Sequence, residues 1–205
     1  MMDTKLENIL KEVRLIFMKY GIRNYSMDDI CRNIGISKKT LYNYVDNKTD
    51  LLQKVLDYEF IMDNGPLGVY LIKGNAIDIL LDVSMRINKE FETFNPIYIF
   101  ELNKYYPKIF KEFVEKKRKV AYEKIYKNLE QGIKEGIYRK DLDIELVTIL
   151  YIRKIEDIHN PDLIESGNFS FKEIFSAMFE NHIRGISNEK GIAYFENQKK
   201  SLNIL

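Results

Sequence analysis

The sequence predicts an all-α protein in which three N-terminal helices are joined by a fourth helix to a larger helical domain. Apolar residues recur every three to four positions along most of the chain, which is the period of a helix with a buried face. Only four prolines and ten glycines interrupt the 205 residues, and no two segments show the alternating pattern of paired strands. With 45% hydrophobic residues, the chain can also bury a core.

Four helices are expected in the first 62 residues. The first covers residues 4–20 and ends at a glycine. Ser26, followed three residues later by Asp29, is close to a capping box and starts the second helix. Ser37 can cap a short third helix, and a fourth begins within residues 46–50.

Residues 35–48, Gly-Ile-Ser-Lys-Lys-Thr-Leu-Tyr-Asn-Tyr-Val-Asp-Asn-Lys, have the helix, turn and helix layout of a helix-turn-helix DNA reader. Leu41 and Val45, one turn apart, can anchor the short helix from behind. Lys38 and Lys39 stand in its first turn, where the helix dipole disfavours cations by about 0.3–1 kcal/mol. Cations at an exposed position where the helix itself disfavours them indicate that a ligand binds there. DNA phosphate is the ligand we expect.

Seven residues of this region are candidate DNA contacts. The amide of Asn43 can bond adenine, and Lys38 can reach guanine O6 or N7. Thr40 can donate to a phosphate or contact a thymine methyl group, with a helix cap as its alternative role. Solvation is the alternative for the two lysines, and packing is the alternative for the ring of Tyr42. The set, which includes expected backbone or phosphate contacts, is Ser26, Lys38, Lys39, Thr40, Tyr42, Asn43 and Tyr44.

Charge and cysteine content limit the class of protein. The net charge of +1 says nothing about nucleic acid, but residues 1–48 hold nine Lys and Arg against six Asp and Glu. Cys31 is the only cysteine, so no intrachain disulfide is possible and a reducing compartment fits. We find neither a signal-peptide pattern nor an apolar run near the roughly 20 residues that span a bilayer. We therefore expect a cytoplasmic protein without a membrane partner.

The best candidate boundary is the segment 63–68, Asp-Asn-Gly-Pro-Leu-Gly. It separates a DNA-binding domain at residues 1–48, with a linking helix at about 48–62, from a second domain at 63–205. The second domain is expected to hold helices at residues 75–92, 96–106, 107–135, 143–159 and 170–185, and one after Gly191.

The helices at 143–159 and 170–185 are apolar on more than one side, whereas a surface helix normally shows one apolar stripe. Such helices either lie in the middle of the protein or cover a partner. Two of them from each of two chains would form a four-helix interface about a two-fold axis. The pattern leaves a buried core and a homodimer equally open.

Residues 9–56 resemble the N-terminal region of the TetR family of bacterial transcriptional regulators. The resemblance combines spacing, caps and residue identity over four helices, through the segments 9–21, 26–30, 35–44 and 47–52. Cys31 stands where the family usually has alanine and Val45 where it usually has phenylalanine, and both changes leave the DNA-facing side intact. The rest of the chain resembles the family in helix layout and in the turn region 132–136.

The resemblance implies a homodimer that places two recognition helices in successive major grooves of a near-palindromic operator. It also implies a C-terminal domain that binds a small molecule and dimerises through its last two main helices, here 143–159 and 170–185. Tyr42 and Lys48 match phosphate contacts of the family, so Lys48 joins the candidate DNA contacts.

Candidate liners of an effector pocket are aromatic residues of the second domain: Phe94, Tyr98, Phe100, Tyr105, Tyr122, Tyr126 and Tyr151. Each could instead be a core or surface residue. His159 and His182 lie in no cluster with metal-ligand spacing, so we expect no metal, and no motif indicates a cofactor. The basic run 116–119 is interpreted as a solvated helix face, with a nucleic-acid patch as the alternative.

The function predicted from these features is a ligand-responsive DNA-binding regulator, most simply a repressor acting as a homodimer on double-stranded DNA. An activator, or a DNA-binding protein of this fold without an effector, is the nearest alternative. An enzyme using the aromatic second domain is a remote one, because no nucleophile is paired with a base. No catalytic residue is therefore predicted.

Overall fold

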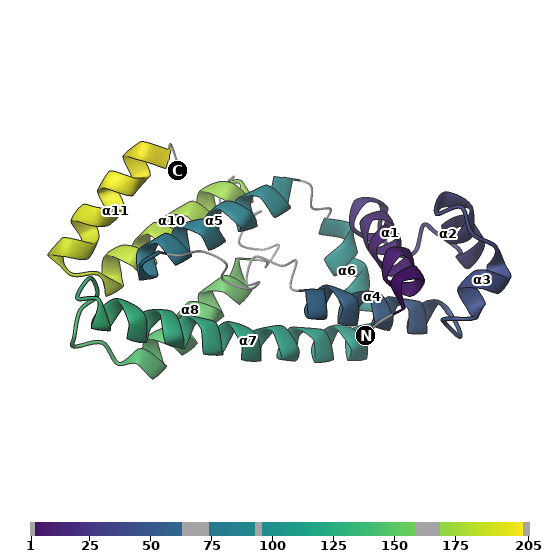
Figure 1. Ribbon diagram of the computed structural model, residues 1–205, viewed down its shortest axis with the longest axis horizontal. Coiled ribbons are helices and arrows are strands. Elements are labelled where there is room, and N and C mark those ends of the chain that lie inside the picture. The colour runs from purple at the N-terminus through teal and green to yellow at the C-terminus, as the bar shows by residue number, and fades with distance from the viewer. Residues whose placement is uncertain (1–2, 63–73, 93–95, 159–168, 203–205) are drawn as a thin grey trace. The chain divides into compact units, whose positions relative to one another are not determined.

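The computed structural model describes residues 3–62, 74–92, 96–158 and 169–202 (Figure 1). These residues confirm the predicted all-α class, since their only extended pairing is an isolated bridge between Tyr138 and Ser187. None of the helices they form is long and apolar enough to cross a membrane. The helices are α1 (Thr4–Tyr20), α2 (Met27–Asn33), α3 (Lys38–Tyr42), α4 (Lys48–Met62), α5 (Ala76–Glu92), α6 (Pro96–Tyr105), α7 (Pro107–Lys134), α8 (Ile144–Asp157), α10 (Phe171–Ile186) and α11 (Glu189–Leu202).

The chain forms two compact units. The first unit comprises residues 1–68 and 92–117, and the second comprises residues 69–91 and 118–205. The first unit therefore contains α6 and the start of α7, which the sequence pattern assigns to the second domain. The boundary proposed at residues 63–68 lies outside the described residues.

In the first unit, α1 packs against both α4 and α6. Leu10 and Phe17 of α1 are fully buried, and so are Leu52 and Leu56 of α4. Burial of each such side chain contributes about 1.5–3 kcal/mol. α6 adds Leu102, also fully buried, to the same core. This shared core holds the short α2 and α3 on a support that three small helices could not provide alone.

In the second unit, α7 is joined to α5 and to the following turn by buried polar contacts. The Tyr138 hydroxyl donates to Asn128 Oδ1 at 3.1 Å, and Asn128 Nδ2 donates to the carbonyl oxygen of Ala76 at 2.9 Å. The Tyr138 ring also lies against Gly132, where a Cβ would come within 2.0 Å of it. Gly132 is therefore needed for close packing in the turn region that resembles the family.

The last helix begins at Glu189, before the predicted start at Gly191. The side chain of Asn188 accepts a hydrogen bond from the Gly191 amide at 3.1 Å and so provides a cap that the pattern did not reveal. A Cβ on Gly191 would lie 2.1 Å from the carbonyl oxygen of Ile137, so this glycine serves close packing rather than ending a helix.

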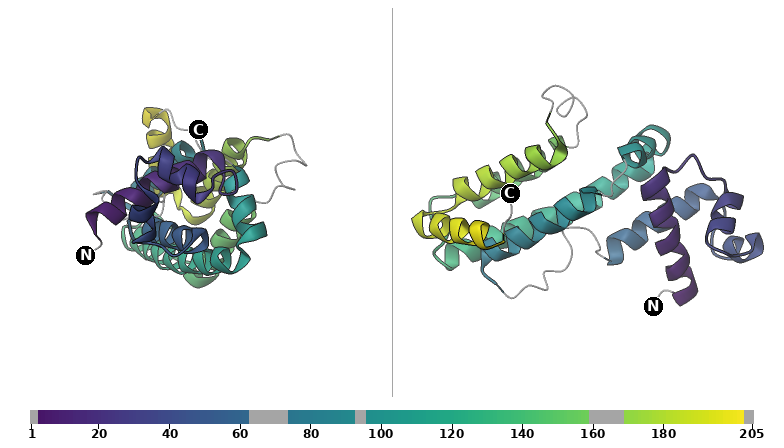
Figure 2. Two further views of the ribbon diagram at one scale, coloured as in Figure 1. Left: turned by 90° about the vertical axis from the view of Figure 1, so that its right-hand side faces the viewer. Right: turned by 90° about the horizontal axis from the view of Figure 1, so that it is seen from above.

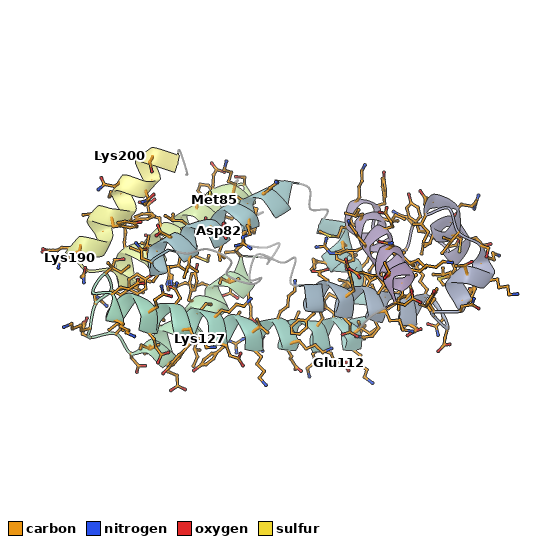
Figure 3. The ribbon with its side chains drawn as sticks, in the orientation of Figure 1. Asp82, Met85, Glu112, Lys127, Lys190 and Lys200 are labelled. Carbon is orange, nitrogen blue, oxygen red and sulfur yellow. The ribbon has the colours of Figure 1, made fainter. Side chains whose placement is uncertain are left out.

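α10 and α11 lie side by side in the second unit (Figure 2). Glu180 of α10 accepts hydrogen bonds from Arg184 and, at 2.7 Å, from Lys199 of α11. Arg184 also pairs with Glu196. Figure 3 shows where the exposed Lys190 and Lys200 stand on α11.

Candidate nucleic-acid interface

The turn between α2 and α3 is built around Gly35, whose φ of +69° lies in the left-handed region that favours glycine. The amide of Ile36 donates to the carbonyl oxygen of Cys31 at 3.0 Å and closes this turn. Leu41 and Val45 are 0% and 2% exposed, so both anchor the short helix as predicted. Because the apolar side of α3 is fixed in this way, its opposite side faces solvent.

Three of the predicted contact residues form the exposed reading face of α3: Lys39, Tyr42 and Asn43. Tyr42 is 48% exposed, although a tyrosine ring on a helix is normally stabilised by packing. α3 ends at Tyr42, and Asn43 is its C-cap. Together the three side chains offer an ammonium group, a hydroxyl and an amide, all of which can bond phosphates or base edges.

The other two residues at the start of α3 already have partners within the protein. Lys38 Nζ pairs with Asp28 of α2 at 2.6 Å, and this hydrogen bond raises the pKa of Lys38. The amide of Thr40 donates the N-cap bond to Ser37 Oγ at 3.1 Å, and the Thr40 hydroxyl lies 2.9 Å from the same oxygen. Ser37 is therefore the cap of α3, and the Thr40 side chain is held beside it.

Ser26 forms the predicted capping box with Asp29. The Ser26 hydroxyl donates to Asp29 Oδ2 at 2.5 Å, and the Ser26 amide donates to the same oxygen at 2.9 Å. These bonds lower the pKa of Asp29, so the carboxyl is ionised at neutral pH. A negative charge therefore already stands at the N-terminus of α2, where a phosphate is predicted to bind.

Tyr44 and Lys48 lie beyond α3. The Tyr44 hydroxyl donates to Asp3 Oδ2 at 3.2 Å, which ties the end of the reading segment to the cap of α1. Lys48 Nζ donates to the carbonyl oxygen of Tyr25 at 2.5 Å. Burial lowers the pKa of Lys48, while the nearby carboxylate of Glu101 opposes this shift. Lys48 is therefore partly withdrawn from solvent.

Two residues at this site were missed by sequence reasoning. The first is Asp28, which pairs with Lys38 across the turn. The second is Glu101, which lies 53 positions after Lys48 in the sequence and whose charge opposes the lowering of the Lys48 pKa by burial. The first depends on the angle between α2 and α3, which their spacing in the sequence does not define. No local pattern marks the second.

The predicted effector liners divide between the two units, and Phe94 lies outside the described residues. In the first unit Tyr98 is buried at 3% exposure, whereas Phe100 and Tyr105 are 57% and 41% exposed. In the second unit Tyr122 stacks with Tyr126, and Tyr151 stacks with His182 at a ring separation of 3.5 Å. No group of His, Cys, Asp and Glu among the described residues could hold a metal ion.

The basic run 116–119 is engaged in ion pairs rather than simply solvated. Lys117 Nζ donates at 3.0 Å to Glu59, a buried carboxylate of α4 that also accepts from Arg14. Lys116 pairs with Asp57 at 2.7 Å. These contacts connect the start of α7 to the core of the first unit and leave little support for a nucleic-acid patch there.

Residues 9–55 match the family described as "Bacterial regulatory proteins, tetR family". No curated protein matches the sequence at a significant level. Among solved structures, the reduced form of NemR from Escherichia coli is similar, with a TM-score of 0.72 and 12% identity over 91% of this chain and 98% of that one.

Two further structures are similar over a comparable length. A putative transcriptional regulator from Saccharomonospora viridis, in complex with choline, has a TM-score of 0.68 and 17% identity, covering 90% of this chain and 98% of that one. A TetR-family regulator from Cytophaga hutchinsonii has a TM-score of 0.69 and 17% identity, covering 92% and 97%. The sequence match of residues 9–55 to the tetR family, together with this likeness in fold along the chain, supports a TetR-family regulator.

Proposed function

We propose that the protein regulates transcription by binding a near-palindromic DNA operator as a homodimer, most simply as a repressor that a small molecule releases. The observation that carries the proposal is the exposed reading face of α3 on a buried anchor. Lys39, Tyr42 and Asn43 point outward where Leu41 and Val45 are buried. An exposed helix with hydrogen-bonding tips, at the second position of a helix-turn-helix, suits insertion into a major groove.

The individual contacts follow from chemistry. Lys39 and Tyr42 would bond phosphates, and Asn43 would read a base edge through its amide. Lys38 would have to leave Asp28 to reach DNA. Both partners of that pair are at least half exposed, and an exposed ion pair contributes only about 0–1 kcal/mol, so a phosphate can replace the carboxylate.

The second copy of the chain would bind at α8 and α10. Leu146, Ile149 and Leu150 of α8 are 52%, 43% and 53% exposed within a single chain. Ile149 and Leu150 follow Leu146 by three and four residues, so they lie on the same side of the helix as Leu146. Water-exposed leucine and isoleucine on one face are typical of a surface that another protein covers. The exposure of this face in a single chain supports the homodimer over the alternative of a buried core.

Release by a ligand would act on the distance between the two α3 helices. They must lie about 34–36 Å apart to enter successive grooves. A ligand that prefers the non-binding state by about 2–3 kcal/mol would lower DNA affinity by tens to hundreds of times. The aromatic residues of the second unit, Tyr122, Tyr126 and Tyr151, are the proposed lining. The choline complex of the Saccharomonospora viridis regulator supports a small-molecule site in this fold.

The test is selection of bound DNA from a random pool by the purified protein near physiological salt. A recovered near-palindrome with half-sites about one helical turn apart is the expected result. Tyr42→Ala should recover no motif under the same conditions. Binding by the wild-type protein that is sensitive to salt but indifferent to sequence would contradict the proposal.

A further inference from the structure

The turn that joins α1 to α2 is held by one buried carboxylate of α6. Glu101, 7% exposed, accepts hydrogen bonds through Oε2 from the backbone amides of Ile22 at 2.5 Å and Arg23 at 3.0 Å. The Ile22 side chain is fully buried. The carboxylate oxygen thus accepts from two backbone N–H groups of the turn that follows α1.

The backbone of this turn comes close to α6 at Gly21. Gly21 has a φ of +82°, in the left-handed region, and ends α1. A Cβ at this position would lie 2.9 Å from Glu101 Oε2 and 3.1 Å from Ile97 Cγ2. The close approach of the carboxylate to the two amides therefore depends on the missing side chain at Gly21.

A second contact joins the same turn to the same face of α6. The guanidinium carbon of Arg23 lies 4.3 Å from the centre of the Tyr105 ring. Ile97, Glu101 and Tyr105 are spaced four residues apart, so they form one stripe along α6. The segment between α1 and α2 therefore contacts α6 along about two helical turns.

The other side of the turn is held by α4. Lys48 Nζ donates to the carbonyl oxygen of Tyr25, the residue just before the N-cap of α2. The carboxylate of Glu101 and the ammonium group of Lys48 attract each other across this segment. The start of α2, and with it the turn that presents α3, is therefore fixed between α6 and α4.

We propose that Glu101 is a positioning residue for DNA binding. Its carboxylate links the position of α6 to the orientation of α2 and α3. This inference rests on the proposed function. Withdrawal of the Glu101 carboxylate from the amides of Ile22 and Arg23 frees the turn and lowers operator affinity without changing any residue that contacts DNA.

The test compares Glu101→Leu, which keeps the size of the side chain but removes both acceptors, with Glu101→Gln, which keeps one acceptor. Glu112→Leu is the matched control, because Glu112 is an exposed carboxylate on α7 in the same unit (Figure 3). Hydrogen exchange at the Ile22 and Arg23 amides and affinity for the selected operator are measured on protein that is folded by circular dichroism.

In Glu101→Leu we expect exchange at both amides to accelerate about tenfold or more, and operator affinity to fall about tenfold, with non-specific DNA binding unchanged. Glu101→Gln should recover most of both losses, and Glu112→Leu should match the wild-type protein. Faster exchange with unchanged operator affinity would overturn the positioning role, and unchanged exchange would overturn the contact itself. If the wild-type protein selects no operator, the proposed function fails, and exchange at the two amides still decides whether the contact exists.

Discussion

Two exposed helix faces of this protein differ in chemistry in a way that indicates different partners. The reading face of α3 presents Lys39, Tyr42 and Asn43, all of which end in polar groups. The exposed face of α8 presents Leu146 and Leu150 together with an isoleucine, none of which can form a hydrogen bond. A polar, basic face is stable in water and can bind a polyanion reversibly, with a strong dependence on salt. An apolar face is most stable when another apolar surface covers it permanently.

The largest effect is expected from breaking the apolar face. Leu150→Asp would place a charge in the proposed dimer interface, and desolvation of that carboxylate should convert the dimer to a monomer. A monomer engages one half-site, so affinity for the full operator should fall about 100-fold or more. Analytical ultracentrifugation gives the oligomeric state, and fluorescence anisotropy gives the affinity.

Leu15→Asp is the control for this substitution, because Leu15 of α1 is 50% exposed and Leu150 is 53% exposed. It should leave the oligomeric state unchanged. Equal loss of the dimer in both variants would mean that α8 has no special role.

A second prediction concerns the pH dependence of stability in the second unit. Both histidines of the chain lie after residue 117, outside the first unit. Burial lowers the pKa of His182 to about 3 in the fold, while an unfolded histidine has a pKa of about 6.5. The unfolded state therefore binds the proton first as pH falls below 6.5. The free energy of unfolding should drop by about 2 kcal/mol between pH 7 and pH 5.

His182→Phe should remove most of this pH dependence, since phenylalanine can keep the stack with Tyr151 and does not titrate in this range. Urea unfolding at pH 7 and pH 5 measures the difference. The same decrease in both proteins would assign the effect to other groups of the chain.

A third prediction separates Lys39 of the reading face from Lys48 of α4. Lys39→Ala should lower affinity for all DNA sequences about tenfold and reduce the slope of log K against log salt by about 0.9. Lys48→Ala should do the same if Lys48 reaches a phosphate as predicted. Because Lys48 is bonded to Tyr25 in the free protein, an unchanged salt slope with a lowered melting temperature would assign it a structural role instead.

The smallest change in affinity is expected for Asn43→Ala. Asn43 is exposed at the C-cap of α3, and its amide can discriminate one base pair by about 1–3 kcal/mol. The variant should select a motif with relaxed preference at one position of each half-site, while affinity for non-specific DNA stays the same. Recovery of an unaltered motif would exclude Asn43 from base readout.

Local signals explain why the fold could be predicted from the sequence. The N-caps of α1, α2 and α3 are Asp3, Ser26 and Ser37. Each side chain accepts a hydrogen bond from a backbone amide two or three residues later, so such a cap depends only on neighbouring residues. The predicted start of α11 was too late, because a glycine in a sequence, here Gly191, can either interrupt a helix or allow close packing within one. Only the contact with the carbonyl oxygen of Ile137 shows that it serves packing.

The candidate site could be predicted less completely, because several of its polar groups bind partners within the protein. The pairing of Lys38 with Asp28 depends on the angle between two helices, which spacing alone does not define. Glu101 lies 78 positions from Arg23 along the chain, so its contact follows from tertiary packing alone. The aromatic liners were chosen by residue type, and residue type does not separate the buried Tyr98 from the exposed Phe100.

The most direct test of the account is native mass spectrometry of the protein on its selected operator, compared with the same operator carrying about five extra base pairs between the half-sites. That insertion turns the half-sites to opposite sides of the duplex. We predict two chains on the original operator and loss of the two-chain complex after the insertion, because in the proposed dimer the two α3 helices would be held at one separation. A single bound chain, or two chains bound equally well to both DNAs, would contradict it.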